Sequence, residues 1–126
     1  MPDYLFQHFY STLAIIAFLL AALENGLSAA IVNPPGYSEH NCGLAADLNS
    51  PEHTGLDAGF EKTAAFRWLK AHAVEYGFIL RYPNGSSDIT GIIYEPWHYR
   101  YVGKDAAQEI FNRDITLEEY LGKTEH

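Results

Sequence analysis

The chain has 126 residues, of which 48% are hydrophobic and 14% aromatic, so it suits one globular domain and is too apolar for a disordered chain. The formal net charge is −8, and the eight Lys and Arg residues are scattered, with none before Lys62. That distribution argues against a nucleic-acid partner. Cys42 is the single cysteine, so no disulfide can form within the chain. We therefore treat residues 1–126 as a single domain.

The N-terminal part is strongly apolar. Residues 4–23 predict a helix, which Glu24-Asn25-Gly26 would end. Residues 13–23 are all apolar, but a helix that crosses a bilayer needs about 20 consecutive apolar residues. Ser28-Ala29-Ala30 resembles a signal cleavage site, although a basic segment before it is lacking. Two interpretations stay open, a buried core helix or a signal or anchor through which residues 11–23 associate with a membrane.

Further along, helical and extended segments alternate. The strongest helix is predicted over residues 58–76, with Asp57 as its N-cap and Gly77 as the residue that ends it. Thr116, with Glu119 three residues later, forms a capping-box pattern that predicts a last short helix. The remaining predicted elements are a rigid loop at 33–36, strands at 43–48, 78–82, 89–94 and 99–102, a turn at 83–87 and a helix at 104–112. Short strands joined by tight turns and flanked by helices indicate an α+β fold with a small antiparallel sheet.

Three residues have the donor types that a catalytic zinc ion requires. Such an ion takes three protein ligands and leaves one position open for water. His40, Asp47 and His98 would supply two imidazole nitrogens and one carboxylate oxygen, from two segments far apart in the chain. The same residues are also compatible with two histidines packed in a core and a turn aspartate. The pattern alone therefore leaves both interpretations open.

Glu95 lies three residues before His98, and Pro96 stands between them. On a regular strand the two side chains would point to opposite faces, because strand side chains alternate. A kink at Pro96 would turn both toward one cavity, where Glu95 could act as a general base on a water molecule at the metal. The alternative is an ion pair between Glu95 and Arg100 or Arg81.

These segments resemble the VanY-type D-alanyl-D-alanine carboxypeptidases. The family pattern Ser-x-His-x-x-Gly-x-Ala-x-Asp stands in full from Ser38 to Asp47, and the pattern Glu-x-Trp-His stands from Glu95 to His98. The neighbouring runs at 76–83, 94–103 and 117–121 fit as well, so the resemblance covers residues 33–122. We expect residues 1–32, an apolar helix and its connector, to be a divergent or truncated front.

The resemblance implies the fold of the hedgehog and D-Ala-D-Ala peptidases, with zinc held by His40, Asp47 and His98 and with Glu95 as catalytic base. It implies a peptide substrate ending in D-Ala-D-Ala, from peptidoglycan or its precursors, and removal of the last D-alanine. We expect a monomer in the bacterial cell envelope, periplasmic or membrane-associated, with a cytoplasmic enzyme acting on precursors as the alternative. Ser38, Trp97 and Arg100 are the residues that we expect to help bind substrate.

The front of the chain departs from the family. Pro2-Asp3 stands before Gln7 where the family carries Arg-Ser, and that arginine helps to bind substrate and to stabilise the oxyanion. A catalytically weak or inactive zinc-folded module that binds wall fragments is therefore one alternative. A D,D-dipeptidase or an endopeptidase of the same family is another, because the loops that close the pocket decide which bond is cut. A catalytic thiol or metal ligand at Cys42 is a further alternative to a small buried residue.

Overall fold

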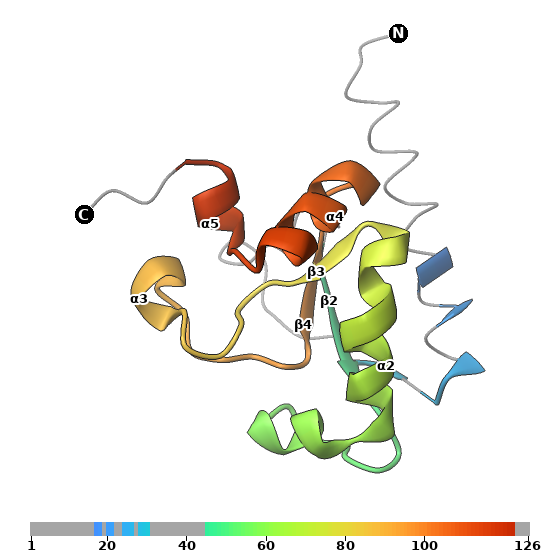
Figure 1. The fold of residues 1–126 in the computed structure, drawn as a ribbon. Coiled ribbons are helices and arrows are strands. Elements are labelled where there is room, and N and C mark those ends of the chain that lie inside the picture. The colour runs from blue at the N-terminus through green and yellow to red at the C-terminus, as the bar shows by residue number, and fades with distance from the viewer. Residues whose placement is uncertain (1–16, 19, 22–23, 27, 31–44, 123–126) are drawn as a thin grey trace, which may run out of the picture.

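The computed structural model describes residues 17–18, 20–21, 24–26, 28–30 and 45–122. In this part of the chain four short strands form one antiparallel sheet in the order β1-β2-β4-β3, and helices surround it (Figure 1). The small antiparallel sheet flanked by helices is as predicted. The strands are β1 Ser28–Ala30, β2 Ala45–Asn49, β3 Phe78–Leu80 and β4 His98–Tyr101. The helices are η2 Ala58–Lys62, α2 Ala64–His72, η3 Ala73–Tyr76, α3 Ser87–Thr90, α4 Lys104–Arg113 and α5 Leu117–Tyr120.

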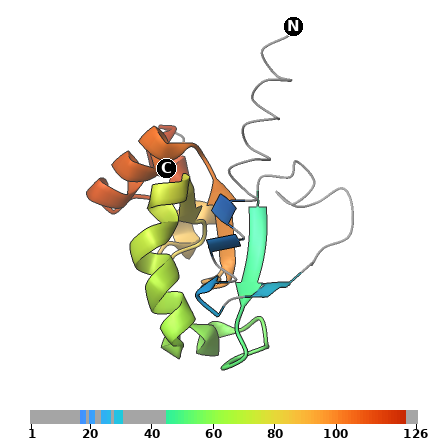
Figure 2. The same cartoon turned by 90° about the vertical axis from the view of Figure 1, so that its right-hand side faces the viewer.

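The larger core lies between α2 and one face of the sheet (Figure 2). Leu48 of β2 and Tyr99 of β4 are each 1% exposed, and they belong to the same cluster as Leu69 of α2. Phe18 stacks on Phe78 of β3, with ring centroids 4.1 Å apart, and is fully buried. Phe18 is therefore part of this core.

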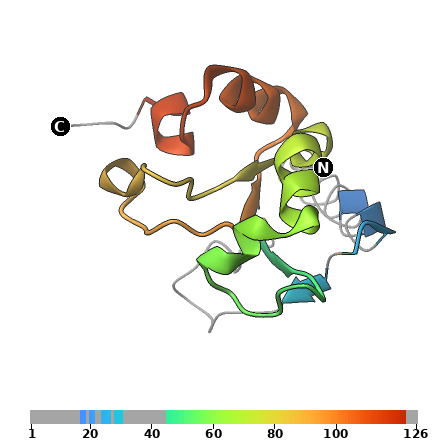
Figure 3. The same ribbon diagram turned by 60° about the horizontal axis from the view of Figure 1, so that its bottom comes forward.

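A second, smaller core lies at the β3 edge of the sheet, where β3 runs between α2 and α4 (Figure 3). Ile79 points to the opposite face from Phe78 and Leu80, because strand side chains alternate. It packs with Ala107 and Ile110 of α4 and with Leu117 of α5. The sheet is thus covered by α2 on one face and, along β3, by α4 and α5 on the other.

The helix predicted over residues 58–76 is divided, so the prediction of one continuous helix is wrong. Asp57 caps the start as expected, with its carboxylate accepting from the Gly59 N–H at 2.8 Å. Thr63, however, has an extended backbone, and its hydroxyl accepts from the Phe66 N–H at 3.0 Å. Thr63 therefore caps a new helix, α2, and separates it from η2. Gly77 ends the segment in the left-handed conformation, φ 84°, as predicted.

The strand predicted over residues 89–94 is wrong. Residues 87–90 form the short helix α3, which ends at Gly91 with φ 76°. Ile92 and Ile93, whose β-branched side chains favoured a strand, are 39% and 72% exposed. Burial against a sheet, which normally stabilises such residues in strands, does not act here. By contrast, the helix predicted at 104–112 is confirmed as α4, and the capping box at Thr116 is present at the start of α5.

The N-terminal prediction is confirmed only for a few residues, because most of residues 4–23 lie outside the described part. Phe18 is helical and fully buried, but Leu20 is helical and 57% exposed. Ser28–Ala30 forms β1, a strand that the sequence did not reveal, paired with Asp47–Asn49 in β2. In the described residues we find no helix that has both the length and the apolar character needed to cross a membrane.

Candidate metal centre

The pairing of β2 with β4 places Asp47 directly opposite His98. Residues opposite each other in an antiparallel pair point to the same face of the sheet. The face is the one turned away from Leu48, Tyr99 and α2. Asp47 Oδ1 lies 2.9 Å from His98 Nδ1, and the two residues are only 3% and 4% exposed. Two of the three predicted ligands, 51 residues apart in the chain, therefore meet through the register of two strands.

Glu95 reaches the same place through a tight turn. The His98 N–H donates to the Glu95 carbonyl at 3.1 Å, with Pro96 at the second position of the turn, where proline is favoured. The turn brings Glu95 Oε2 to 3.8 Å from His98 Nδ1. The predicted kink at Pro96 is thus present. The Glu95 side chain is 23% exposed, so it lies at the solvent side of the buried Asp47–His98 pair.

The donor types of this pair suit a metal ion. An imidazole nitrogen and a carboxylate oxygen are both zinc donors, and two donors on one tetrahedral zinc ion lie about 3.3 Å apart when each bond is about 2.0–2.1 Å. The 2.9 Å between Nδ1 and Oδ1 is the length of a direct hydrogen bond, and it is about 0.4 Å shorter than that spacing. His40, the predicted third ligand, lies outside the described residues, and within the residues described we find no cluster of three or more His, Cys, Asp or Glu side chains that could hold a metal. The described residues thus fit two of the three predicted ligand positions.

The predicted substrate-binding residues fall in different places. Arg100 follows His98 by two positions on β4, so its half-buried side chain points to the face that carries the Asp47–His98 pair. Trp97 is half-buried and packs against the core beneath α2, which favours a packing role. Ser38 and Cys42 lie outside the described residues. Substrate binding by Ser38, Trp97 and Arg100 stays a prediction.

Two other contacts at this site were not predicted. The ring of Tyr82 stacks on the His98 imidazole, with centroids 5.0 Å apart and planes at 29°. Arg81 forms a bidentate ion pair with Glu118 of α5, with N–O distances of 3.0 and 2.5 Å. Glu118, 37 residues away in the chain, is thus a partner of Arg81 that the sequence did not predict. No local signal in the sequence links these residues, because the first contact depends on the pairing of β3 with β4 and the second on the packing of α5.

The remaining described histidines form local pairs. His53 Nε2 lies 2.8 Å from Asp57 Oδ1, beside the cap of η2. His72 Nδ1 lies 3.0 Å from Glu75 Oε1 at the end of α2. Both pairs join residues that are three or four positions apart in the sequence. His53 therefore lies beside a loop cap and His72 at the end of a helix, each next to a carboxylate of its own segment.

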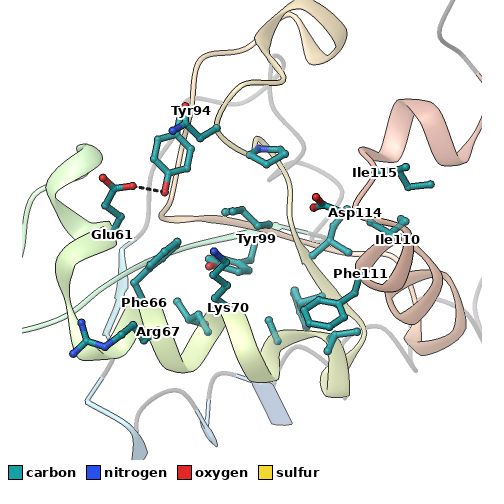
Figure 4. A pocket seen from close by; sticks show the side chains of 18 residues that line it. Glu61, Phe66, Arg67, Lys70, Tyr94, Tyr99, Ile110, Phe111, Asp114 and Ile115 are labelled. Atoms are coloured by element: carbon teal, nitrogen blue, oxygen red, sulfur yellow. Dashed lines mark hydrogen bonds between the residues drawn. The ribbon is translucent and has the colours of Figure 1, made fainter.

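The structure also contains a groove of about 740 Å³ between α2 and α4, away from the Asp47–His98 pair (Figure 4). Tyr99 lines it, and burial raises the pKa of the Tyr99 hydroxyl, which stays protonated. At one end Tyr94 donates a hydrogen bond to Glu61 at 2.9 Å, and burial, together with that carboxylate, raises the Tyr94 pKa as well. The groove is lined by neither Glu95 nor His98, so it is not part of the candidate metal centre.

Comparison with known proteins identifies the family. Residues 6–104 match the family model VanY: D-alanyl-D-alanine carboxypeptidase, so the chain belongs to the VanY family. A curated relative, the putative carboxypeptidase YodJ of Bacillus subtilis (strain 168), is 51% identical over 90 residues. That alignment covers 71% of this chain and 33% of the relative. The chain therefore spans about a third of the length of this relative.

Two solved structures place the fold in the same group. The structure of the LdcB LD-carboxypeptidase, described in connection with peptidoglycan recognition, has a TM-score of 0.79 and 36% identity, covering 92% of this chain and 68% of that one. A variant of the vancomycin resistance D,D-pentapeptidase VanY, solved in complex with Zn(II), has a TM-score of 0.58 and 44% identity, covering 71% and 48%. The sheet and helices described above are therefore those of a known peptidase fold.

Proposed function

We propose that the chain is a zinc-dependent D-alanyl-D-alanine carboxypeptidase that removes the terminal D-alanine from peptidoglycan peptides. The observation that carries the proposal is the convergence of Asp47, His98 and Glu95 on one face of the sheet. This convergence occurs in a chain of the VanY family, in which a related peptidase has been solved with Zn(II). Two of the three residues, Asp47 and His98, are buried although they are ionisable, and such residues are seldom fully buried unless they are paired or serve a function.

Asp47 and His98, with His40 as the third ligand, would hold the zinc ion. When bound, zinc supplies a Lewis acid that polarises the scissile carbonyl and lowers the pKa of water to about 7. Asp47 and His98 are held in place by the β2–β4 ladder, because they are directly opposite each other in the pairing of the two strands. Rigid strands hold ligands more accurately than loops do.

Glu95 is the general base in this proposal. Its carboxylate lies 3.8 Å from His98 Nδ1, close to the donor atoms, and remains partly exposed to solvent. From there it can accept a proton from the attacking water and deliver that proton to the leaving amine. The turn through Pro96 fixes the distance between Glu95 and His98, since the His98 N–H is bonded to the Glu95 carbonyl.

Arg100 is the described cation best placed to attract the carboxylate at the end of a substrate. It follows His98 on β4 and points to the same face. Residues 1–61 contain no Lys or Arg. For that reason a zinc-binding module without turnover stays as the alternative. We infer that the protein acts in the cell envelope or outside the cell, where peptidoglycan lies.

The test measures zinc content and D-alanine release on the same purified protein, with a pentapeptide ending in D-Ala-D-Ala. We expect about one zinc ion per chain and, in Glu95→Gln, an unchanged zinc content with release lowered about 10²–10⁴-fold. The matched control is Glu109→Gln, the same change at a glutamate on α4 whose side chain is 50% exposed and which is not part of the proposed site. Zinc binding without release in either protein would favour the binding module, and absence of zinc would refute the proposal.

A second candidate reaction is hydrolysis of the bond between an L-residue and a terminal D-alanine. It is favoured by the similarity to the LdcB LD-carboxypeptidase, which covers more of this chain than the VanY structure does. The same assay distinguishes the two reactions when a tetrapeptide ending in an L-residue and D-alanine is compared with the pentapeptide. Faster release from the tetrapeptide would assign the L,D specificity and leave the metal centre unchanged.

A further inference from the structure

The dipeptide Arg81-Tyr82, immediately after β3, brackets the turn that carries Glu95 and His98. The Arg81 N–H donates to the His98 carbonyl at 3.1 Å, and the Tyr82 carbonyl accepts from the Glu95 N–H at 3.1 Å. Both ends of the Glu95–His98 turn are therefore bonded to two consecutive residues of one neighbouring segment. A shift of this segment would displace the turn as a unit.

The side chain of Tyr82 continues this contact to the His98 ring. The two rings are stacked, with a centroid distance of 5.0 Å, and the His98 side chain is 5% exposed. Rotation about the bond to an imidazole ring is governed by a broad torsional minimum, so the ring orientation depends on its neighbours. The stacked Tyr82 ring restricts that rotation and keeps Nδ1 directed toward Asp47.

Tyr82 is itself connected to the last helix. The Arg81 guanidinium lies over the Tyr82 ring, 4.8 Å from its centroid, and is bound to Glu118 of α5 through two hydrogen bonds. The side chains of this ion pair are 10% and 19% exposed, so solvent screens it only weakly. The Thr116 capping box fixes the first turn of α5, in which Glu118 lies.

We propose that Tyr82 is a positioning residue for His98, and that the Arg81–Glu118 ion pair holds Tyr82 in place. The proposal rests on the proposed function, because it assigns the ring orientation of a predicted zinc ligand to residues that do not touch the metal. It gives α5 a part in the metal centre although this helix lies apart from the β2–β4 pair. Outer residues that orient metal ligands commonly change metal affinity when they are replaced.

The experiment measures zinc affinity by competition with a chelator, and the thermal unfolding of the zinc-free protein. We expect Tyr82→Leu to weaken zinc binding about 10–100-fold, since a branched aliphatic group cannot stack on the imidazole. Tyr82→Phe keeps the ring and should bind zinc nearly as well as the unchanged chain. The matched control is Tyr101→Leu, the same change on β4 at a side chain that packs in the α2 core. It should lower the melting temperature and leave the zinc affinity of the folded protein unchanged.

Glu118→Gln tests the outer end of the chain of contacts without altering the stacked rings. We expect Glu118→Gln to lower zinc affinity several-fold, which is less than the loss expected in Tyr82→Leu. If Tyr82→Leu does not fold, Glu118→Gln takes its place as the test. Equal zinc affinity in Tyr82→Leu and the unchanged chain would overturn the proposal, as would a loss in Tyr82→Phe equal to that in Tyr82→Leu. If the unchanged chain binds no zinc, the proposed function itself fails, which is a different result.

Discussion

The two faces of one sheet differ in what they bury. On the face covered by α2, Leu48 and Tyr99 pack into an apolar core. On the other face, the neighbouring positions Asp47 and His98 are buried just as deeply but form a polar pair. Burying an apolar side chain is favourable by itself, whereas burying an ionisable pair is costly unless its groups are bonded to each other or to a metal. Strands β2 and β4 thus bury apolar side chains on one face and an ionisable pair on the other, while Ile79 of β3 adds a smaller apolar core beside that pair.

The largest effects are expected for His98→Ala and Leu48→Ala. The first changes the polar face of the sheet on β4, and the second changes the apolar face on the neighbouring strand β2. His98→Ala removes a proposed metal ligand. Replacing a residue that only orients a ligand lowers metal affinity about 10–100-fold, so His98→Ala should lower zinc affinity and D-alanine release by more than that. Leu48→Ala should lower the free energy of unfolding by about 3 kcal/mol and leave zinc affinity unchanged, because it creates a cavity in the core. Chelator competition and urea unfolding measure the two effects. A Leu48→Ala protein that folds but loses zinc would show that the faces are not independent.

A smaller effect is expected at the edge of the polar face, where Arg81 pairs with Glu118. Glu118→Gln leaves a mostly buried guanidinium without its carboxylate and should lower the free energy of unfolding by about 2 kcal/mol. Glu109→Gln removes the carboxylate from the Glu109–Arg113 pair, whose side chains are 50% and 55% exposed. Because this pair is exposed, the free energy of unfolding should change by less than about 0.5 kcal/mol. Urea unfolding of both variants measures the difference. Equal stabilities would indicate that the Arg81 pair is solvated.

The smallest effect concerns two tyrosine hydroxyls near the groove on the α2 side. In the described structure the buried Tyr99 hydroxyl has no hydrogen-bond partner, so Tyr99→Phe should raise the free energy of unfolding by about 1 kcal/mol. Tyr94→Phe removes the hydrogen bond to Glu61 and should lower it by about 0.5–1 kcal/mol. The opposite signs make the pair its own control in one unfolding series. Destabilisation by Tyr99→Phe would reveal a partner for that hydroxyl, for example an ordered water.

Local sequence signals predicted much of the secondary structure because their causes are local. Asp57, Gly77 and Thr116 act through hydrogen bonds or backbone conformations within a few residues, and each is found in the predicted role. The strand predicted at 89–94 failed because β-branched residues favour strands only where a sheet can bury them, and Ile93 is 72% exposed. Likewise, the continuous helix at 58–76 failed because Thr63 caps a new helix rather than continuing the first.

For this protein the sequence by itself determined the family motif, the donor types of the proposed ligands and the turn at Pro96 that joins Glu95 to His98. Only the tertiary structure decided that Asp47 and His98 face each other, that β1 joins the sheet, and that Tyr82 stacks on His98. The physical reason is the range of the interactions. Caps and turns depend on neighbouring residues, whereas strand register, ring stacking and the ion pair between Arg81 and Glu118 depend on the packing of segments that are far apart in the chain.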